Sequence, residues 1–165
     1  MHAARMPDWY PAIYVNGGTA VTTTRFALLC AVHLFLERDG AVLLLQRRNT
    51  GYEDGNYSVI AGHLDGGEEV IAAAIREARE EAGITLAPDD LRVVGVMHRQ
   101  SDAEYINFFV AANHWTGEIT NAEPDKCAEL AWFPRDGLPP NVIPYVRQAL
   151  ENYARGIWFD SFGWA

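Results

Sequence analysis

The chain of 165 residues contains little cysteine and few basic residues. Its two cysteines, Cys30 and Cys127, lie far apart and show no CxxC or metal-ligand spacing, which argues against a disulfide framework. Both are expected to be buried or half-buried thiols in a reducing compartment. The 13 Lys and Arg residues are outnumbered by 22 Asp and Glu residues, giving a formal net charge of −9. This balance argues against a nucleic-acid polymer as partner, because binding a polyanion requires clustered cations.

Long apolar runs are also absent. No stretch approaches the roughly 18 apolar residues of a membrane span, and the N-terminus lacks the apolar core of a signal peptide. We therefore expect a cytoplasmic protein with no membrane partner. No internal repeat or linker marks a second domain. The predicted organisation is an irregular extension over residues 1–25, one domain over residues 26–155 and an aromatic tail over residues 156–165. That tail could cover the sheet or bury itself in a second subunit.

The pattern of apolar residues predicts an α/β/α layered unit with a central mixed sheet. "DG" at positions 39 and 40 joins two apolar runs, as in a tight hairpin, and Gly83 is suited to a left-handed helix cap. Strands are expected at 26–37, 41–48, 57–62, 91–99, 105–115 and 130–133, and helices from 68 or 69 to 82 and over 141–155.

The first predicted helix carries a concentration of negative charge. Glu77, Glu80 and Glu81 lie at spacings i, i+3 and i+4, which places them on one helical face. Each like-charged pair costs about 0.2–0.5 kcal/mol, and the helix dipole disfavours anions in the last turn. A solvated surface with an Arg76–Glu80 ion pair is the simplest interpretation of this segment alone. Divalent cations would relieve the repulsion, since Mg²⁺ prefers a shell of carboxylate and phosphate oxygens.

The residues around these glutamates favour the second interpretation. From Gly62 to Ile84 the sequence reads "GHLDGGEEVIAAAIREAREEAGI". It resembles the Nudix box of the Nudix (MutT-like) hydrolases, GX5EX7REUXEEXGU, where U is a bulky aliphatic residue, and every fixed position matches. Ala78 is smaller than the usual aliphatic residue at the first U, which is expected to loosen packing under the helix. The resemblance covers about residues 26–155 and implies the Nudix fold.

The resemblance implies roles for the residues of the box. Glu77, Glu80 and Glu81 would bind Mg²⁺ or Mn²⁺ as the catalytic carboxylates, together with the backbone carbonyl of Ala61. Structural roles would fall to an Arg76–Glu68 ion pair and to Gly62 and Gly83, which would permit turns. The implied reaction is hydrolysis of a nucleoside diphosphate linked to another group. Glu77 is the first candidate for the general base. Further candidates for a base or an extra ligand are Glu123, Asp125 and Glu104, each of which could equally be a surface acid.

Six residues are candidates for substrate contact, and each has a structural alternative. His33 could be a buried core histidine, His63 a loop-stabilising residue, Arg99 the end of a strand, and Tyr52 part of a connecting loop rather than a lid. Trp132 and Phe133 could wall a base pocket or belong to the core.

The resemblance leaves several functions open. A MutT-like (d)NTP pyrophosphatase that releases a nucleoside monophosphate and pyrophosphate is the first expectation, with ADP-ribose, nucleotide-sugar and dinucleotide polyphosphate hydrolases as alternatives. A non-catalytic nucleotide-binding Nudix protein is disfavoured because all the box carboxylates are present. An isoprenoid diphosphate isomerase is disfavoured because neither cysteine lies in a suitable context. The expected partner is a small nucleotide-type substrate, and the chain is expected to be a monomer or a homodimer.

Overall fold

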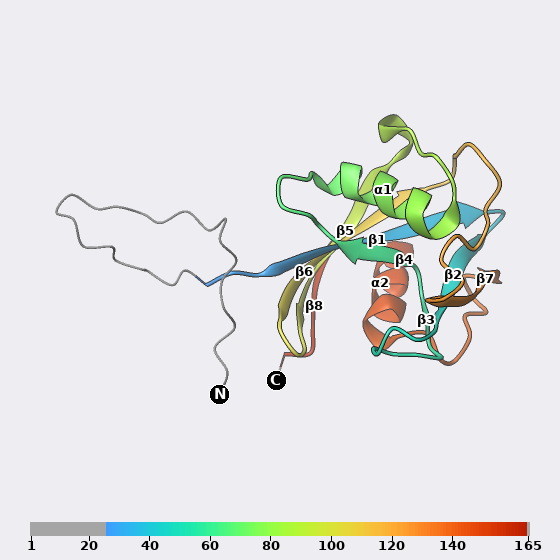
Figure 1. Cartoon of the computed structure of the whole chain (residues 1–165). Coiled ribbons are helices and arrows are strands. Elements are labelled where there is room, and N and C mark those ends of the chain that lie inside the picture. The colour runs from blue at the N-terminus through green and yellow to red at the C-terminus, as the bar shows by residue number, and fades with distance from the viewer. Residues whose placement is uncertain (1–25, 165) are drawn as a thin grey trace.

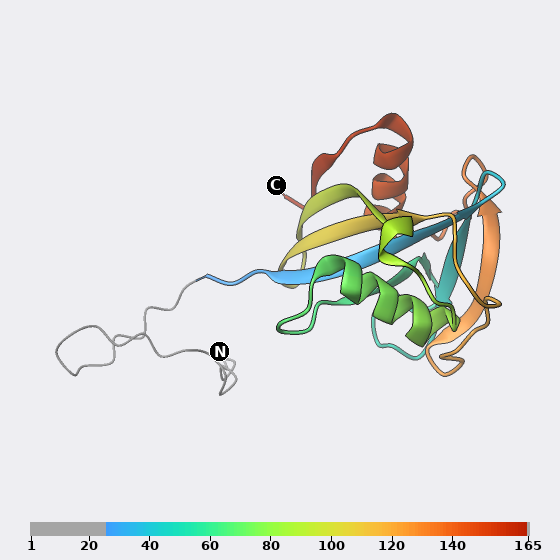
Figure 2. The same ribbon diagram turned by 90° about the horizontal axis from the view of Figure 1, so that it is seen from above.

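The computed structural model describes residues 26–164 of the chain. The predicted N-terminal extension therefore lies outside the described residues. The described part is a mixed β-sheet with one long helix on each face, which Figure 1 shows from the side and Figure 2 from above. The predicted α/β/α arrangement is confirmed.

The strands form a central sheet and a smaller antiparallel group. They are β1 Leu29–Arg38, β2 Ala41–Arg47, β3 Tyr57–Ser58, β4 Ile60–His63, β5 Arg92–Gln100, β6 Glu104–Ala112, β7 Cys127–Pro134 and β8 Phe159–Phe162. The central sheet has the order β4-β1-β6-β5-β8, in which β6 is parallel to β1 and β8 is parallel to β5. Strand β2 pairs with β1 only beside the predicted Asp39–Gly40 turn and then pairs with β3 and β7.

Both long helices end as the sequence predicts, and both begin later than predicted, α1 by one or two residues and α2 by three. Helix α1, Val70–Ala82, is capped by the Glu69 carboxylate, and it ends at Gly83, whose φ of 70° is left-handed. Helix α2, Pro144–Arg155, starts three residues after the predicted position 141. Proline favours the first helical position, because its missing N–H would have no helical acceptor there. A short 3₁₀ helix, Pro88–Asp90, follows α1.

The aromatic tail, for which the sequence predicted no element, adds strand β8 to the edge of the sheet. Asp160 in this strand accepts hydrogen bonds from Gln148 and Asn152 of α2 at 2.6 and 2.7 Å. These bonds hold β8 beside β5. Trp158 and Phe159 are 59% and 57% exposed, so the tail extends the sheet and leaves large side chains at the surface.

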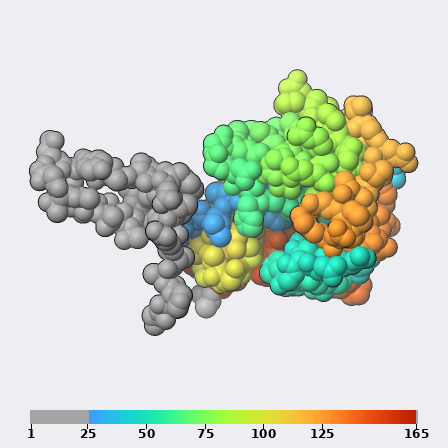
Figure 3. Space-filling view, viewed as in Figure 1, coloured from blue at the N-terminus to red at the C-terminus, as the bar shows by residue number. Residues whose placement is uncertain are grey.

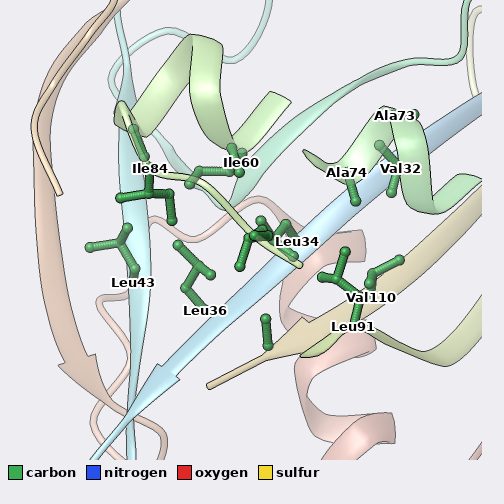
Figure 4. Packing of buried hydrophobic residues seen from close by; sticks show 14 residues of the cluster. Val32, Leu34, Leu36, Leu43, Ile60, Ala73, Ala74, Ile84, Leu91 and Val110 are labelled. Atoms are coloured by element: carbon green, nitrogen blue, oxygen red, sulfur yellow. The ribbon is translucent and has the colours of Figure 1, made fainter. Parts of the chain in front are cut away.

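The hydrophobic core lies in two layers, one on each face of the sheet. Under α1, Val32, Leu34 and Leu36 of β1 pack against alanines of the helix, as Figure 4 shows for part of this layer. Ala78 is fully buried there, and the other buried alanines of α1 are Ala73, Ala74 and Ala82. The second layer packs Phe35, Phe109 and Met97 against α2.

The predictions about the cysteines and about membrane-spanning segments can be compared with the described residues. Cys30 is half-buried and Cys127 is buried, and both are free thiols, as expected. Within residues 26–164, neither helix is long and apolar enough to cross a membrane.

Candidate active site

The three glutamates of α1 have different surroundings. The Glu77 side chain is 10% exposed, whereas the Glu80 side chain is 50% exposed. Glu81 is half-buried, and its Oε2 accepts a hydrogen bond of 3.0 Å from the backbone N–H of Ala61 in β4. Two carboxylates therefore contact β4, and the third faces solvent. We call these three residues the acidic face of α1.

Gly62 allows the Glu77 carboxylate to lie directly against β4. A Cβ atom at position 62 would lie 1.8 Å from Glu77 Oε1 and 2.2 Å from its Cδ, so any side chain there would displace the carboxylate. Gly62 lies inside β4, between Ala61 and His63, rather than at the predicted turn. The absence of a side chain at Gly62 allows β4 and α1 to approach closely. Of the two motif glycines, Gly83 is the one with the left-handed conformation that a turn requires.

Arg76 connects the loop before α1 to the acidic face. Its Nε and Nη2 donate to the two carboxylate oxygens of Glu68 at 2.9 and 3.0 Å, a bidentate pair, and Nη2 also donates to the His63 carbonyl at 3.0 Å. Its Nη1 donates to Glu77 and Glu80 at 2.5 and 3.1 Å. The sequence predicts the contacts with Glu68 and Glu80 but not the contact with Glu77. The contacts with Glu77 and Glu80 make Arg76 a partial counter-charge for the acidic face.

The two inner carboxylates remain short of positive charge. Burial raises the pKa of Glu81 to about 8. The hydrogen bond from Ala61 opposes this shift, and the negative charges of Glu77 and Glu123 increase it. Burial also raises the pKa of Glu77, although Arg76 acts in the opposite direction. An added cation would stabilise both carboxylates in their charged forms.

The chemistry of these donors suits a hard divalent cation, but their arrangement is not a closed cage. Across residues 26–164, no group of three or more His, Cys, Asp and Glu side chains is gathered closely enough to hold a metal ion. Mg²⁺ commonly binds one or two protein carboxylates and completes its shell with water and substrate phosphate. Glu77 and Glu81, beside the backbone of Ala61, fit that partial kind of site.

A cleft of about 370 Å³ lies beside the Ala61–Gly62 segment. It brings together four of the predicted substrate contacts, which are His33, Tyr52, His63 and Arg99. Its other lining residues are Ala31, Arg47, Ala61, Gly62, Asp102, Tyr105, Asn107 and Tyr145. In Figure 3 this hollow lies between the teal loop near residue 52, the green β4 segment and the yellow turn near residue 102, with part of the red C-terminal region behind it.

The floor of the cleft is polar and buried. His33 is 3% exposed, and its Nε2 lies 3.0 Å from the Tyr145 hydroxyl. Burial, together with the positive charge of Arg99, lowers the pKa of His33 to about 3, so its ring is neutral at physiological pH. The Arg99 guanidinium lies 4.0 Å from the Tyr105 ring centroid and 4.7 Å from that of Tyr145. Asn107 is fully buried between these groups and the sheet. We call His33, Arg99 and Asn107 the cleft floor.

Comparison with known proteins identifies the family. A family model described as "NUDIX domain" matches residues 28–153, most of the chain. The chain belongs to the Nudix family.

Curated Nudix relatives are longer proteins with different named substrates. The chain is 33% identical over 97 residues to a protein of Pseudomonas aeruginosa named NAD-capped RNA hydrolase NudC, with 59% of the chain and 34% of that protein covered. It is 31% identical over 108 residues to human 8-oxo-dGDP phosphatase NUDT18, covering 64% of the chain and 32% of that protein. The chain thus spans about a third of the length of these relatives.

Solved Nudix structures share the fold. The chain is 29% identical to a MutT NUDIX hydrolase from Burkholderia pseudomallei, with a TM-score of 0.71 over 76% of the chain and 98% of that structure. The Escherichia coli ORF135 protein superposes with a TM-score of 0.66 at 21% identity, over 78% of the chain and 89% of that structure. The second likeness shows the fold alone.

Two predicted substrate contacts lie outside the cleft of this Nudix domain. Trp132 faces a separate shallow groove, where it stacks on Trp115 at 6.0 Å between ring centroids and lies under Arg38. Phe133 points to the opposite side of β7 and packs edge-on against Tyr57 in the α2 layer. Their strand pairs with β2 in the smaller group, away from β1, β5 and β6, so neither residue joins the other four candidates in the cleft.

The three alternative acids lie in different places. Glu123 follows a segment docked on the end of α1, where the Ala122 N–H donates to the Glu81 carbonyl at 3.2 Å, and Glu123 also pairs with Lys126 at 2.7 Å. Asp125 is exposed, and its backbone carbonyl accepts from Asn49. Glu104 is the first residue of β6, and its Oε2 lies 3.4 Å from His98 Nε2. Of these three acids, Glu123 is the one whose negative charge raises the pKa of both Glu77 and Glu81.

The sequence did not single out Arg47, Tyr105, Asn107 or Tyr145, which also line the cleft. Asn107 could have been recognised from the sequence as a candidate site residue, because it is the one amide within the otherwise apolar run "YINFFVAA". A polar residue at a core-facing strand position requires a partner. Tyr145 gave no such signal, since an aromatic residue near the start of an amphipathic helix is ordinarily core.

Proposed function

We propose that this Nudix chain is a Mg²⁺- or Mn²⁺-dependent hydrolase of a nucleoside diphosphate linked to another group. Its first candidate substrate is a (d)NTP, which would yield a nucleoside monophosphate and pyrophosphate. The observation that carries the proposal is the contact of Glu77 and Glu81 with Ala61–Gly62, because those two strand residues also line the cleft. A diphosphate in the cleft would therefore adjoin the acidic face.

Each group of residues has a role in this proposal. Glu77, Glu80, Glu81 and the Ala61 carbonyl would hold the cation. When bound, it would neutralise phosphate charge and lower the pKa of the attacking water. Arg76 orients Glu77 and Glu80 through its hydrogen bonds, and its pair with Glu68 fixes the loop before the helix. Glu77 would take the proton from the water, with Glu123 as the alternative base.

The names of the relatives widen the range of substrates. ADP-ribose, nucleotide sugars, dinucleotide polyphosphates, an oxidised deoxyguanosine diphosphate and NAD-capped RNA all contain a phosphoric anhydride. A small nucleotide is favoured over capped RNA by the net charge of −9, which opposes a polyanion. A cytoplasmic location and a monomeric or homodimeric state belong to the same proposal. Non-catalytic nucleotide binding is the alternative that the test must exclude.

The test is a panel of these compounds assayed with Mg²⁺ and with Mn²⁺. Glu81→Gln should lower turnover of the best substrate on the order of 10²–10³-fold, as loss of a transition-state electrostatic contact does. Glu151→Gln, which changes an exposed glutamate of α2, is the matched control and should retain turnover. Absence of turnover above the Glu81→Gln level for every compound would favour the non-catalytic alternative.

A further inference from the structure

Half of the central sheet has no helix over it on the side where α1 packs. The core layer under α1 takes side chains from β1, β4 and β6, and within residues 26–164 no residue of β5 or β8 belongs to it. In Figure 2, which looks down on α1, strand β5 lies beside the helix rather than beneath it. The α1 side of β5 and β8, and of the β6 residues next to them, is therefore left without a covering helix.

Strand register gathers apolar side chains on this uncovered side. Two rows run across β6, β5 and β8, and they are Phe108–Val96–Phe159 and Ile106–His98–Ser161. The strand neighbours Phe109 and Met97 are buried in the α2 layer, so alternation along β6 and β5 turns the two rows toward the α1 side. Asp160 of β8 reaches α2, which turns Phe159 and Ser161 the same way. We call these two rows the bare sheet face.

The bare sheet face is an exposed apolar patch. Phe159 is 57% exposed, and the other three apolar residues of the two rows are half-buried and belong to neither core layer. Trp164 extends the patch, because its ring lies 4.5 Å from that of His98 between centroids and is itself part of a residue that is 47% exposed. Contiguous apolar patches of this kind mark a surface that another segment or molecule covers.

The chain that leads into β1 joins the sheet at the margin of this face. Cys30, the second residue of β1, pairs with Ile106 of the bare sheet face. Residues 1–25 precede the described chain, so they connect to it at that margin. Residues 9–15 read "WYPAIYV", an uncharged run with five large apolar or aromatic side chains, and residues 16–25 read "NGGTAVTTTR", which is rich in Gly and Thr.

The length of residues 16–25 matches the distance from β1 to the far side of the face. From β1 across β6 and β5 to β8 there are three strand spacings, or about 14 Å. Ten residues of flexible composition have a root-mean-square end-to-end distance of about 16–19 Å. A tether that matches its span gives the attached segment an effective concentration in the millimolar range, which a second copy in dilute solution does not reach.

Charge also favours a segment of the same chain over a second copy. The whole chain has a net charge of −9, so two copies repel each other, whereas residues 1–25 contain two arginines and one aspartate. We propose that residues 9–15 of the same chain cover the bare sheet face. The cleft opens on the other side of the sheet, so this contact leaves it uncovered. The inference goes beyond the proposed hydrolase function and does not depend on it.

The test is a double-mutant cycle measured by thermal melting of the full chain. Ile13→Asp places a charge in the apolar run, and Phe159→Asp places one on the bare sheet face. Each should lower the melting temperature by about 2–4 °C. The double variant should melt no lower than the less stable single variant, because both changes break the same contact. Val21→Asp is the matched control outside the run, and it should shift the melting temperature by less than about 1 °C.

Two further measurements guard against a misfolded variant and identify the occupant of the face. If Phe159→Asp fails to fold, Ser161→Glu places a charge on the same face at an exposed position and removes no apolar group. It should show the same coupling to Ile13→Asp. Sedimentation equilibrium should give the same mass for the unmodified chain and for the variant of the face, since the proposed contact lies within one chain.

Three outcomes would overturn the inference. They are an unchanged melting temperature in Ile13→Asp, losses that add in the double variant, and a sedimenting mass that is halved by the change on the face. The last outcome would make a second copy the occupant of the bare sheet face. None of these measurements uses turnover, so the substrate panel decides the hydrolase proposal separately.

Discussion

The acidic face and the cleft floor both contain buried polar groups, but they differ in how the chain assembles them. Glu77 and Glu81 come from one helix and need only β4 beside it. His33, Arg99 and Asn107 come from three strands, and α2 supplies the tyrosine that holds His33. Among the described residues, Arg76 neutralises the first region only in part, and each side chain of the second region keeps at least one polar atom without a hydrogen-bond partner. Within one Nudix domain, the residues proposed to hold the cation are brought together by one helix and its neighbouring strand, whereas the cleft floor depends on long-range topology.

The largest effect is expected where the two regions meet. Gly62→Ala would place a methyl group 1.8 Å from Glu77 Oε1 and should displace that carboxylate. We expect turnover to fall on the order of 10²-fold, as for other misplacements of about 1 Å. Gly66→Ala is the matched control, because no atom lies within 4 Å of its added Cβ. Equal turnover of the two variants would contradict this placement of Glu77.

This contrast also explains which parts of the molecule could be predicted. The helix, its Gly83 cap and the gathering of glutamates follow from residue order within some 20 positions. The Gly62 contact needed the structure, because a glycine in sequence does not reveal what occupies the space of its missing side chain. Strand β8 was missed because "WFDSF" alternates weakly, and its place depends on Asp160 reaching α2. The separate groove of Trp132 could not be predicted either, because it depends on the long-range pairing of β7 with β2.

Arg76→Lys tests whether the acidic face is held in place by a fork of hydrogen bonds. Lysine cannot reproduce the bidentate pair with Glu68 while also reaching Glu77. We expect the free energy of unfolding to fall by about 1–2 kcal/mol in urea denaturation. Arg79→Lys changes an exposed arginine of the same helix and should lie within about 0.5 kcal/mol of the unmodified chain. Equal losses of unfolding free energy in Arg76→Lys and Arg79→Lys would mean that the hydrogen bonds of Arg76 contribute little to stability.

The cleft floor should respond to acid. The folded chain keeps His33 neutral, with a pKa of about 3, whereas the unfolded chain takes up a proton near the ordinary value of 6.5. Stability linked to His33 is therefore complete above pH 6.5 and is lost as the pH falls towards 3, by about 1.4 kcal/mol per pH unit. Urea denaturation at several pH values measures how the free energy of unfolding changes with pH. In His33→Gln this slope should be smaller by that amount. His114→Gln, an exposed control, should keep the original slope.

The smallest effect is expected at the rim of the cleft, where Tyr52 is 42% exposed. Its ring lines the cleft, with the Arg47 guanidinium 5.4 Å from the ring centroid, so it is placed to stack on a base. Tyr52→Leu should raise KM about five- to tenfold and leave kcat unchanged, the lower end of the roughly 1–3 kcal/mol per base that stacking contributes, because the ring is partly exposed. Trp132→Leu, in the separate groove, should change KM less than about twofold. If Trp132→Leu has the larger effect on KM, the base binds on the β7 side of the domain and not in the cleft.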